Sequence, residues 1–310
     1  MNTAISLDQV SHHFKNIIAV DNLSLTIHEG ETFGLLGPNG AGKTTVINLI
    51  TGLLHRQDGK ISVKGFDPRK QSKEVRKRIG LVPQETNVYE DLNAFDNLLH
   101  HAALYCSELS NIEHQIETQL QLFELWERRT DAVRTFSGGM RRRLALSRAL
   151  LHNPEIIFFD EPTLGVDVQG RHVLWDHIKI QSQEGKTFII STNDMLEADT
   201  LCDRLVILDH GKAIALDAPE KLKSDLGRDI ISLQTDRPLD NPEAFFSWIK
   251  PHGLSIPKPN HYRFEVKNGE GIIGDVVSKI TSEYRLESFH VTRPTLDDVF
   301  LHHTGRALRE

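Results

Sequence analysis

The sequence has few cysteines, and it lacks both a long apolar run and an excess of positive charge. Its two cysteines, Cys106 and Cys202, show no Cys-x-x-Cys spacing, which argues against a disulfide framework and against a zinc site. We therefore expect a reducing, cytoplasmic setting. No apolar run approaches the ~18–20 residues that cross a bilayer. Residues 1–4 also lack the basic segment and apolar core that open a signal peptide.

The charge balance argues against nucleic acid as a partner. The formal net charge is −7, whereas a protein that binds phosphate backbones needs a basic face. Histidine pairs such as His12-His13 and His302-His303 show no metal-ligand spacing, and we interpret them as surface residues. At 310 residues, the chain suits one large domain followed by a small one.

The most informative stretch is a glycine-rich loop between an expected strand at 32–36 and an expected helix at 43–54. Its glycines let backbone N–H groups converge on phosphate oxygens. Lys43 can then reach the β- and γ-phosphates, and the Thr44 hydroxyl can ligate Mg²⁺. A purely structural loop is the less favoured interpretation. The pattern G-x-x-x-x-G-K-[ST] is matched by Gly37, Pro38, Asn39, Gly40, Ala41, Gly42, Lys43 and Thr44, with Thr45 following.

A second expected strand, at 155–160, ends in two carboxylates. Residues 156–159 form a continuous apolar run, which is typical of a strand buried on both faces. Asp160 and Glu161 follow at its carboxyl end, where ligands bind in open α/β sheets. Together with the glycine loop, this pair predicts that Asp160 holds Mg²⁺ and that Glu161 is the general base for an attacking water. Alone, such a pair is often only a helix cap.

A third segment lies between these two motifs. Ser137-Gly138-Gly139-Met140 precedes an expected helix, so its hydroxyl and N–H groups would form an anion-binding helix start. The glycine loop, this segment and Asp160-Glu161-Pro162-Thr163, in that order, resemble the motifs of ABC ATPases. The family signature is commonly Leu-Ser-Gly-Gly-Gln, with Ser-Gly-Gly-Met as a variant. The resemblance implies that Ser137, Gly138 and Gly139 contact the γ-phosphate of ATP held by the opposite subunit.

The resemblance, which covers residues 1 to about 225, implies roles for three further residues. Phe14 stands where the family places an aromatic ring that stacks on adenine. Gln84 matches the glutamine that senses Mg²⁺ and water and links to the transmembrane partner. Asp167 matches the aspartate that helps join the two halves of a dimer. By itself, Phe14 would be interpreted as a core residue.

One position departs from the family pattern. The family has a histidine after a strand and a Ser/Thr-Thr pair, and here Asn193 follows Ser191-Thr192. An amide can donate a hydrogen bond to a phosphate oxygen, but it carries no charge. The departure therefore predicts slow hydrolysis with ATP binding intact.

The order of elements predicts an α/β fold, because alternating strands and helices imply a mainly parallel sheet covered by helices. The resemblance adds a P-loop core, an antiparallel N-terminal sheet and a helical subdomain at about 86–150. The pattern changes near residue 220, and Gly227-Arg228 suggests a break. We expect an ATPase domain at 1–225 and a small α+β domain at 228–310. Residues 292–306 resemble the end of daunorubicin-resistance-type exporter subunits.

These expectations combine into an ATP- and Mg²⁺-dependent exporter subunit. The resemblance implies a homodimer with two shared ATP sites that drives a separate integral membrane permease from the cytoplasmic face. A soluble ABC protein of translation or DNA repair is less favoured, because such proteins usually carry two cassettes or a long coiled-coil insertion. An ATP-gated binding module with little turnover is a third interpretation, suggested only by Asn193.

Overall fold

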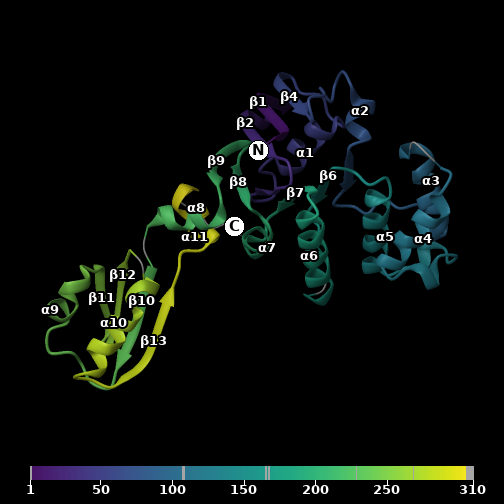
Figure 1. Cartoon of the computed structure of the whole chain (residues 1–310). Helices are drawn as coiled ribbons and strands as arrows, with labels where there is room; N and C mark the ends of the chain where they lie inside the picture. The colour runs from purple at the N-terminus through teal and green to yellow at the C-terminus, as the bar shows by residue number, and fades with distance from the viewer. Residues whose placement is uncertain are drawn as a thin grey trace. The chain divides into compact units, whose positions relative to one another are not determined.

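The computed structural model describes residues 2–106, 109–164, 166, 168–227, 229–267 and 269–304. The chain divides into two compact units, residues 1–218 and 219–310 (Figure 1). The predicted domain boundary, between 225 and 228, lies one helix further along the chain, after α8 (Pro219–Leu226). As a boundary between independently folding domains it stays a prediction.

The first unit is built on a six-stranded sheet in the order β5-β6-β7-β3-β8-β9. Five of its strands are parallel, and only the edge strand β9 is antiparallel. The two segments that predicted strands, at 32–36 and 155–160, lie in β3 and β6. These two strands and β7 are buried along their whole length. The predicted α/β fold is therefore confirmed. The strands are β3 (Thr32–Leu36), β5 (Ile79–Val82), β6 (Ile156–Asp160), β7 (Thr187–Thr192), β8 (Arg204–Asp209) and β9 (Lys212–Asp217).

Strand register brings the chemistry-bearing segments to one edge of this sheet. Leu36 at the end of β3 pairs with Thr192 at the end of β7. Asp160 at the end of β6 pairs with Ser191, also in β7. Because parallel strands place their carboxyl ends at the same edge, the segments that follow β3, β5, β6 and β7 meet there.

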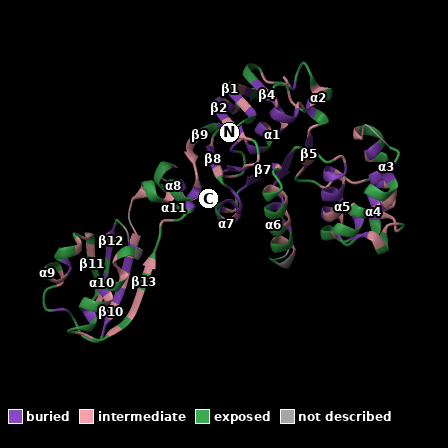
Figure 2. Cartoon of the chain, in the orientation of Figure 1, coloured by how far each residue is buried: buried purple, intermediate pink, exposed green. Residues whose placement is uncertain are grey.

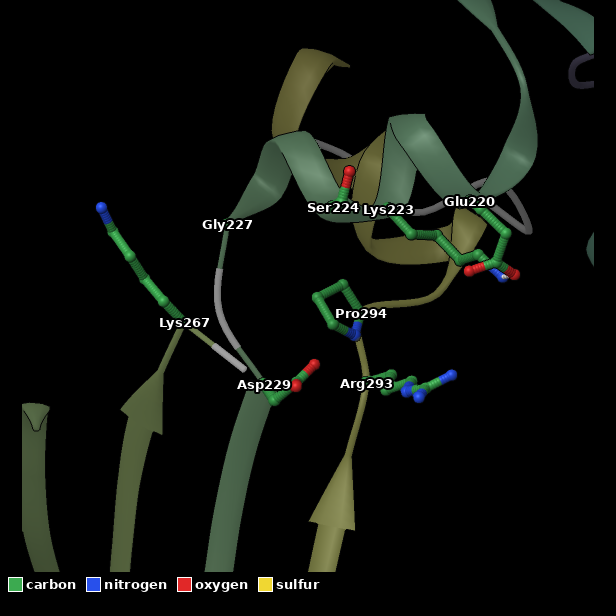
Figure 3. A pocket seen from close by; sticks show the side chains of 8 residues that line it. All are labelled: Glu220, Lys223, Ser224, Gly227, Asp229, Lys267, Arg293 and Pro294. Atoms are coloured by element: carbon green, nitrogen blue, oxygen red, sulfur yellow. Dashed lines mark hydrogen bonds and ion pairs between the residues drawn. The ribbon is translucent and has the colours of Figure 1, made fainter. Parts of the chain in front are cut away.

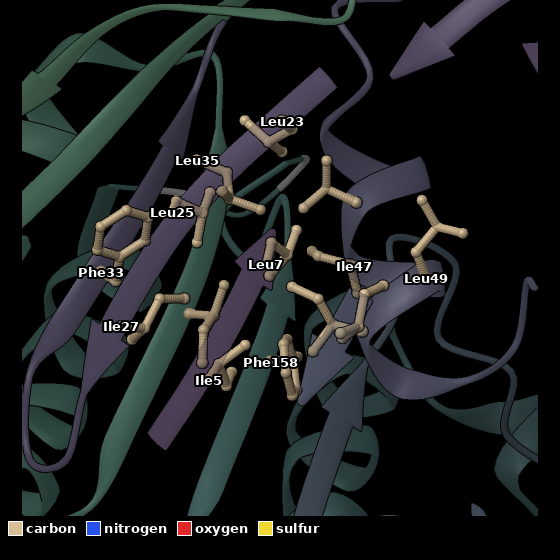
Figure 4. Close-up of a cluster of buried hydrophobic side chains, with 14 of the residues drawn as sticks. Ile5, Leu7, Leu23, Leu25, Ile27, Phe33, Leu35, Ile47, Leu49 and Phe158 are labelled. Atoms are coloured by element: carbon tan, nitrogen blue, oxygen red, sulfur yellow. The ribbon is translucent and has the colours of Figure 1, made fainter. Parts of the chain in front are cut away.

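An antiparallel N-terminal sheet packs on this core, as predicted. Its strands β1 (Thr3–Phe14), β2 (Ile17–His28) and β4 (Asp58–Val63) lie in the order β2-β1-β4. Alternate residues of β1 and β2, among them Ile5 and Leu25, meet Phe33 and Phe158 of the central sheet in one buried cluster (Figure 4). Helix α1 (Lys43–Thr51) adds Ile47 to the same cluster. The cluster thus fixes the helix that begins directly after the glycine loop.

Helices complete the first unit, several of them between β5 and β6. Helix α5 matters most for the site, because it begins directly after Ser137. The helices are α2 (Ser72–Arg76), α3 (Ala94–Tyr105), α4 (Ile112–Leu122), α5 (Gly138–Leu150), α6 (Val168–Gln183) and α7 (Met195–Leu201).

The second unit has a four-stranded antiparallel sheet in the order β11-β12-β10-β13. Its own core includes Phe246, Tyr262 and Phe264, each 1% exposed. Figure 2 shows buried segments along the strands of this sheet. Nowhere in the described parts of the chain is a helix both long and apolar enough to cross a membrane. The remaining elements are α8 (Pro219–Leu226), β10 (Asp229–Thr235), α9 (Pro242–Phe246), β11 (His252–Lys258), β12 (His261–Val266), α10 (Gly269–Thr281), β13 (Leu286–Thr292) and α11 (Leu296–Thr304).

Candidate functional site

The glycine loop has the tight geometry that its sequence predicts. A Cβ atom at Gly37 would collide with the carbonyl oxygen of Leu208. Gly42 has a φ of 106°, and a Cβ there would collide with the carbonyl oxygen of Ala19. Glycine is the residue that tolerates both constraints. Gly42 is also the N-cap residue of α1, so the first-turn N–H groups of this helix form an anion-binding start beside the loop.

Lys43 is folded over this loop and faces the acidic pair. Its Nζ atom donates to the carbonyl oxygens of Gly37, at 2.7 Å, and Pro38, at 3.1 Å. The same atom lies 3.6 Å from Oε1 of Glu161. Burial lowers the pKa of Lys43, and the Glu161 carboxylate opposes that shift. The lysine is therefore held between the glycine loop and a carboxylate.

A hydroxyl and a carboxylate lie side by side at the base of the loop. The Thr44 hydroxyl donates to Oδ1 of Asp160 at 3.2 Å, and the Ser191 hydroxyl donates to the same oxygen. Asp160 is only 3% exposed. Magnesium prefers hard oxygen ligands and usually takes one or two from the protein, with phosphate and water completing its shell. The Thr44–Asp160 pair fits that pattern. No cluster of three or more histidine, cysteine or acidic side chains able to hold a metal occurs in the residues that the structure describes.

Glu161 has an unusual backbone and two side-chain contacts within the site. Its φ of 47° is left-handed, which is uncommon for a residue with a Cβ atom. Its N–H donates to the carbonyl oxygen of Ser191 at 3.0 Å and to the Ser191 hydroxyl at 3.1 Å. Its Oε2 atom accepts from Nε2 of Gln84 at 3.0 Å, while Oε1 faces Lys43. The structure thus brings together Lys43, Gln84 and Glu161, which the sequence places far apart.

The Ser137 segment is exposed. The Ser137 side chain caps α5 by accepting from the N–H of Met140 at 3.2 Å. A Cβ atom added to Gly138 or Gly139 would meet nothing within 4 Å. The start of this helix is therefore open to a ligand from outside, as an anion-binding segment requires.

Other predicted residues lie at the borders of the site or outside the described residues. Phe14 ends β1, is 46% exposed and makes an edge contact with His12. The loop tip, Asn39 and Gly40, is exposed, and Thr45 lies in the first turn of α1. Asp167 lies outside the part of the chain that the structure describes, so its predicted role stays a prediction.

Asn193 is exposed and comes directly after β7, beside an acidic residue that is already engaged. Oδ1 of Asp194 caps α7 by accepting from the N–H groups of Leu196 and Glu197. Oδ2 of Asp194 accepts from Arg171 at 2.9 Å. Both oxygens of Asp194 therefore have partners, so this carboxylate is poorly placed to replace a missing histidine.

Ser191 is a site residue that the sequence reasoning missed. It is fully buried, and it bonds both Asp160 and the backbone of Glu161. In the sequence it served only to locate Asn193. Its position could have predicted this role. Ser191 lies at the carboxyl end of a buried strand that neighbours β6, and that end is close to the acidic pair.

A cavity of about 490 Å³ lies in the second unit, and it contains none of the predicted site residues (Figure 3). Its carboxylates have local partners: Asp229 accepts from the N–H of Gly269 at 2.6 Å, and Glu220 pairs with Lys223 at 2.7 Å. The cationic side chains of Lys267 and Arg293 extend in different directions and do not converge on one point. We assign no ligand to it.

Comparison with known families agrees with this geometry. Residues 20–164 match the family described as ABC transporter. Residues 218–304 match a second family, described as ATP-binding protein DrrA1-3-like, C-terminal domain. The first match covers part of the first unit, and the second match covers most of the second unit.

Individual relatives match over nearly the whole chain. The linearmycin resistance ATP-binding protein LnrL of Bacillus subtilis is 36% identical, over 94% of this chain and 95% of the relative. The Nod factor export ATP-binding protein I of Burkholderia lata is also 36% identical, over 99% of this chain and 98% of the relative. Among solved structures, an ATP-binding subunit of an ABC transporter has a TM-score of 0.67 at 26% identity, covering 72% of this chain and 93% of its own. A dimeric bacterial ABC transporter cassette has a TM-score of 0.63 at 28% identity, covering 69% and 98%.

Proposed function

The chain belongs to the ABC transporter ATP-binding family and is an ATPase, and from this premise we propose that it drives an exporter through a separate integral membrane permease. The named relatives support the direction of transport: one is a linearmycin resistance protein and the other a Nod factor export protein. The match of the second unit to the DrrA1-3-like family supports it too. We propose that the subunit acts at the cytoplasmic face of the membrane, and we expect no nucleic-acid partner.

One observation carries the catalytic part of this proposal: the Glu161 carboxylate is in contact with both the loop lysine and Gln84. We propose that Lys43 binds the β- and γ-phosphates of ATP. Thr44 and Asp160 would hold Mg²⁺, which neutralises the charge that develops on the phosphates. Glu161 would then accept a proton from the attacking water, and Gln84 would orient that water. The remaining loop residues would cradle the phosphates, and Phe14 would stack on adenine.

The same proposal requires two copies of the chain. A chain carries one glycine loop and one Ser137 segment, so a two-fold dimer yields two complete sites, each combining the loop of one copy with the Ser137 segment of the other. Asp167 would help to join the two copies. The solved cassette relative that is dimeric supports this arrangement. ATP would close the dimer and hydrolysis would open it, which provides the motion that drives the permease.

A membrane partner separates this proposal from a soluble ABC protein of translation or DNA repair. We expect the tagged chain, extracted in mild detergent, to co-purify with a polytopic membrane protein in a fixed ratio, because the chain supplies the motor and the partner supplies the pathway. Mass spectrometry of the purified complex measures this. Recovery of the chain with ribosomes or DNA, and with no membrane protein, would contradict the exporter proposal.

Replacing Asn193 by histidine should speed hydrolysis. A protonated imidazole forms a charge-assisted hydrogen bond to phosphate that is about twice as strong as the bond from a neutral amide. An additional bond of this kind in the transition state is worth about 1–3 kcal/mol, or about 5- to 150-fold in kcat. The measurement is steady-state phosphate release at saturating Mg-ATP. Asn111→His, at an exposed asparagine before α4, is the control and should leave kcat unchanged. A histidine variant no faster than wild type would show that Asn193 does not limit turnover.

A further inference from the structure

We propose that Arg142 is a positioning residue that holds the backbones of Glu161 and Gln84 so that their side chains stay in contact. The inference rests on the proposed roles of those two residues in hydrolysis. Arg142 lies in α5, on the helix that Ser137 caps, and it is only 7% exposed. It stands within a run of three arginines that, by sequence alone, suggests a basic surface.

The guanidinium of Arg142 reaches two separate segments of the site at once. It donates to backbone carbonyl oxygens on both sides of the Gln84–Glu161 contact. Arginine presents five N–H donors in a rigid planar fork, which suits several fixed acceptors. The bonds run from Nη1 to Pro83 at 2.7 Å and Gln84 at 3.3 Å, from Nε to Pro162 at 3.2 Å, and from Nη2 to Glu161 at 3.4 Å and Asp160 at 3.5 Å.

The backbone of Glu161 needs this support. Its left-handed φ of 47° is a conformation that persists only when the surroundings determine it. Ser191 holds the N–H of Glu161, while Arg142 holds the carbonyl groups of Glu161 and of the residues on either side. The same guanidinium holds the carbonyl of Gln84, whose side chain donates to the Glu161 carboxylate. Arg142 therefore fixes the backbones of both partners in that contact.

A different cation could not take over this role. Burial lowers the pKa of Arg142, and the carboxylates of Asp160 and Glu197 oppose that shift. A guanidinium stays charged under such conditions, and it is more weakly hydrated than an ammonium group. Lysine would supply its three donors from one point and could not span the same acceptors. We therefore expect Arg142→Lys to behave like a loss of the side chain.

The test compares catalysis with stability in the full-length chain. We expect Arg142→Met to lower kcat by about 10²-fold, because a small misplacement of catalytic groups has an effect of that size. Affinity for a fluorescent ATP analogue should stay near the wild-type value, since the glycine loop is unchanged. Arg142→Lys should not restore kcat. Arg56→Gln is the matched control: it removes an arginine bonded to Asp67 and to the Gly59 carbonyl, outside the site. It should lower the thermal midpoint and leave kcat of the folded protein unchanged.

A double-mutant cycle that combines Arg142→Met with Gln84→Ala distinguishes positioning from a purely structural role, because a purely structural role would give no coupling in kcat between the two substitutions. If Arg142 acts through the Gln84–Glu161 contact, the fold reduction in kcat of the double variant should be far smaller than the product of the two single reductions. The proposal would be overturned if the two reductions in kcat multiply in the double variant. It would also be overturned if Arg142→Met lowers stability and leaves kcat unchanged. If Arg142→Met does not fold, Arg142→Gln serves in the same cycle. If wild type and Glu161→Gln hydrolyse ATP equally fast, the proposed function fails first and this inference with it.

Discussion

Glu161→Gln is expected to lower kcat for ATP hydrolysis by about 10²–10⁴-fold, the contribution of a well-placed general base. The amide has the size of the carboxylate, and its oxygen can still accept from Gln84, but it cannot take a proton from water. ATP should still bind, since the proposed phosphate contacts are made by the glycine loop, which this variant leaves unchanged. Phosphate release at saturating Mg-ATP, together with binding of a fluorescent ATP analogue, measures the two effects separately. Unchanged phosphate release would remove Glu161 from the role of base.

Two other variants are needed to interpret this result. Glu155→Gln is the matched control, because Glu155 precedes the same strand, is half-exposed and pairs with Lys64 at 2.8 Å. It should hydrolyse ATP at the wild-type rate. Lys43→Ala should instead lose productive ATP binding, because the buried ammonium that faces the loop is gone. The three variants distinguish a defect in chemistry from a defect in binding and from a general loss of charge.

The buried strands and the glycine loop could be predicted because their signals are local. A strand covered on both faces must be apolar throughout, so β3, β6 and β7 stand out as runs. The edge strand β11 does not stand out as an apolar run, because it contains Gly253 and Pro257 and is partly exposed. It also pairs irregularly with β12. Strand β9 was missed for a similar reason, since none of its residues is fully buried.

The position at which a helix ends is decided by one or two residues. The first helix was expected to reach residue 54, but it ends at Thr51 because Gly52 adopts a left-handed φ of 77°. Helix α7 ends at Leu201, because the chain enters β8 at Arg204, which pairs there with Phe33.

The site contains features that arise only from the assembled fold. The motifs locate Lys43, Asp160 and Glu161, but no local pattern shows that Glu161 takes a left-handed backbone. Nor does any local pattern show that Arg142 is buried while its neighbours in the arginine run are not. Both depend on contacts between segments that are distant in the chain. Sequence therefore identifies the groups that we propose react, and the fold identifies the groups that contact them.

Ser137→Arg is expected to abolish the ATP-dependent dimer. In the Glu161→Gln background we expect ATP to be bound but hydrolysed very slowly, so sedimentation should show dimers with Mg-ATP and monomers without it. Ser137 and the two glycines after it are exposed, with open space around them. Under the proposed arrangement, the γ-phosphate held by the other copy fills that space. A long arginine side chain would occupy the same space and block closure.

A matched variant shows whether position or charge is responsible. Ser110→Arg places the same side chain at another exposed serine of the first unit, and it should leave the dimer intact. In the proposed dimer each copy contributes its Ser137 segment to the other copy's site, so Ser137→Arg is expected to damage both sites at once. In the background that retains Glu161, its hydrolysis should therefore fall with the dimer, while ATP binding to the glycine loop of the monomer remains. Dimers that persist in the Ser137→Arg protein and depend on ATP would show that this segment does not meet the nucleotide of a second copy.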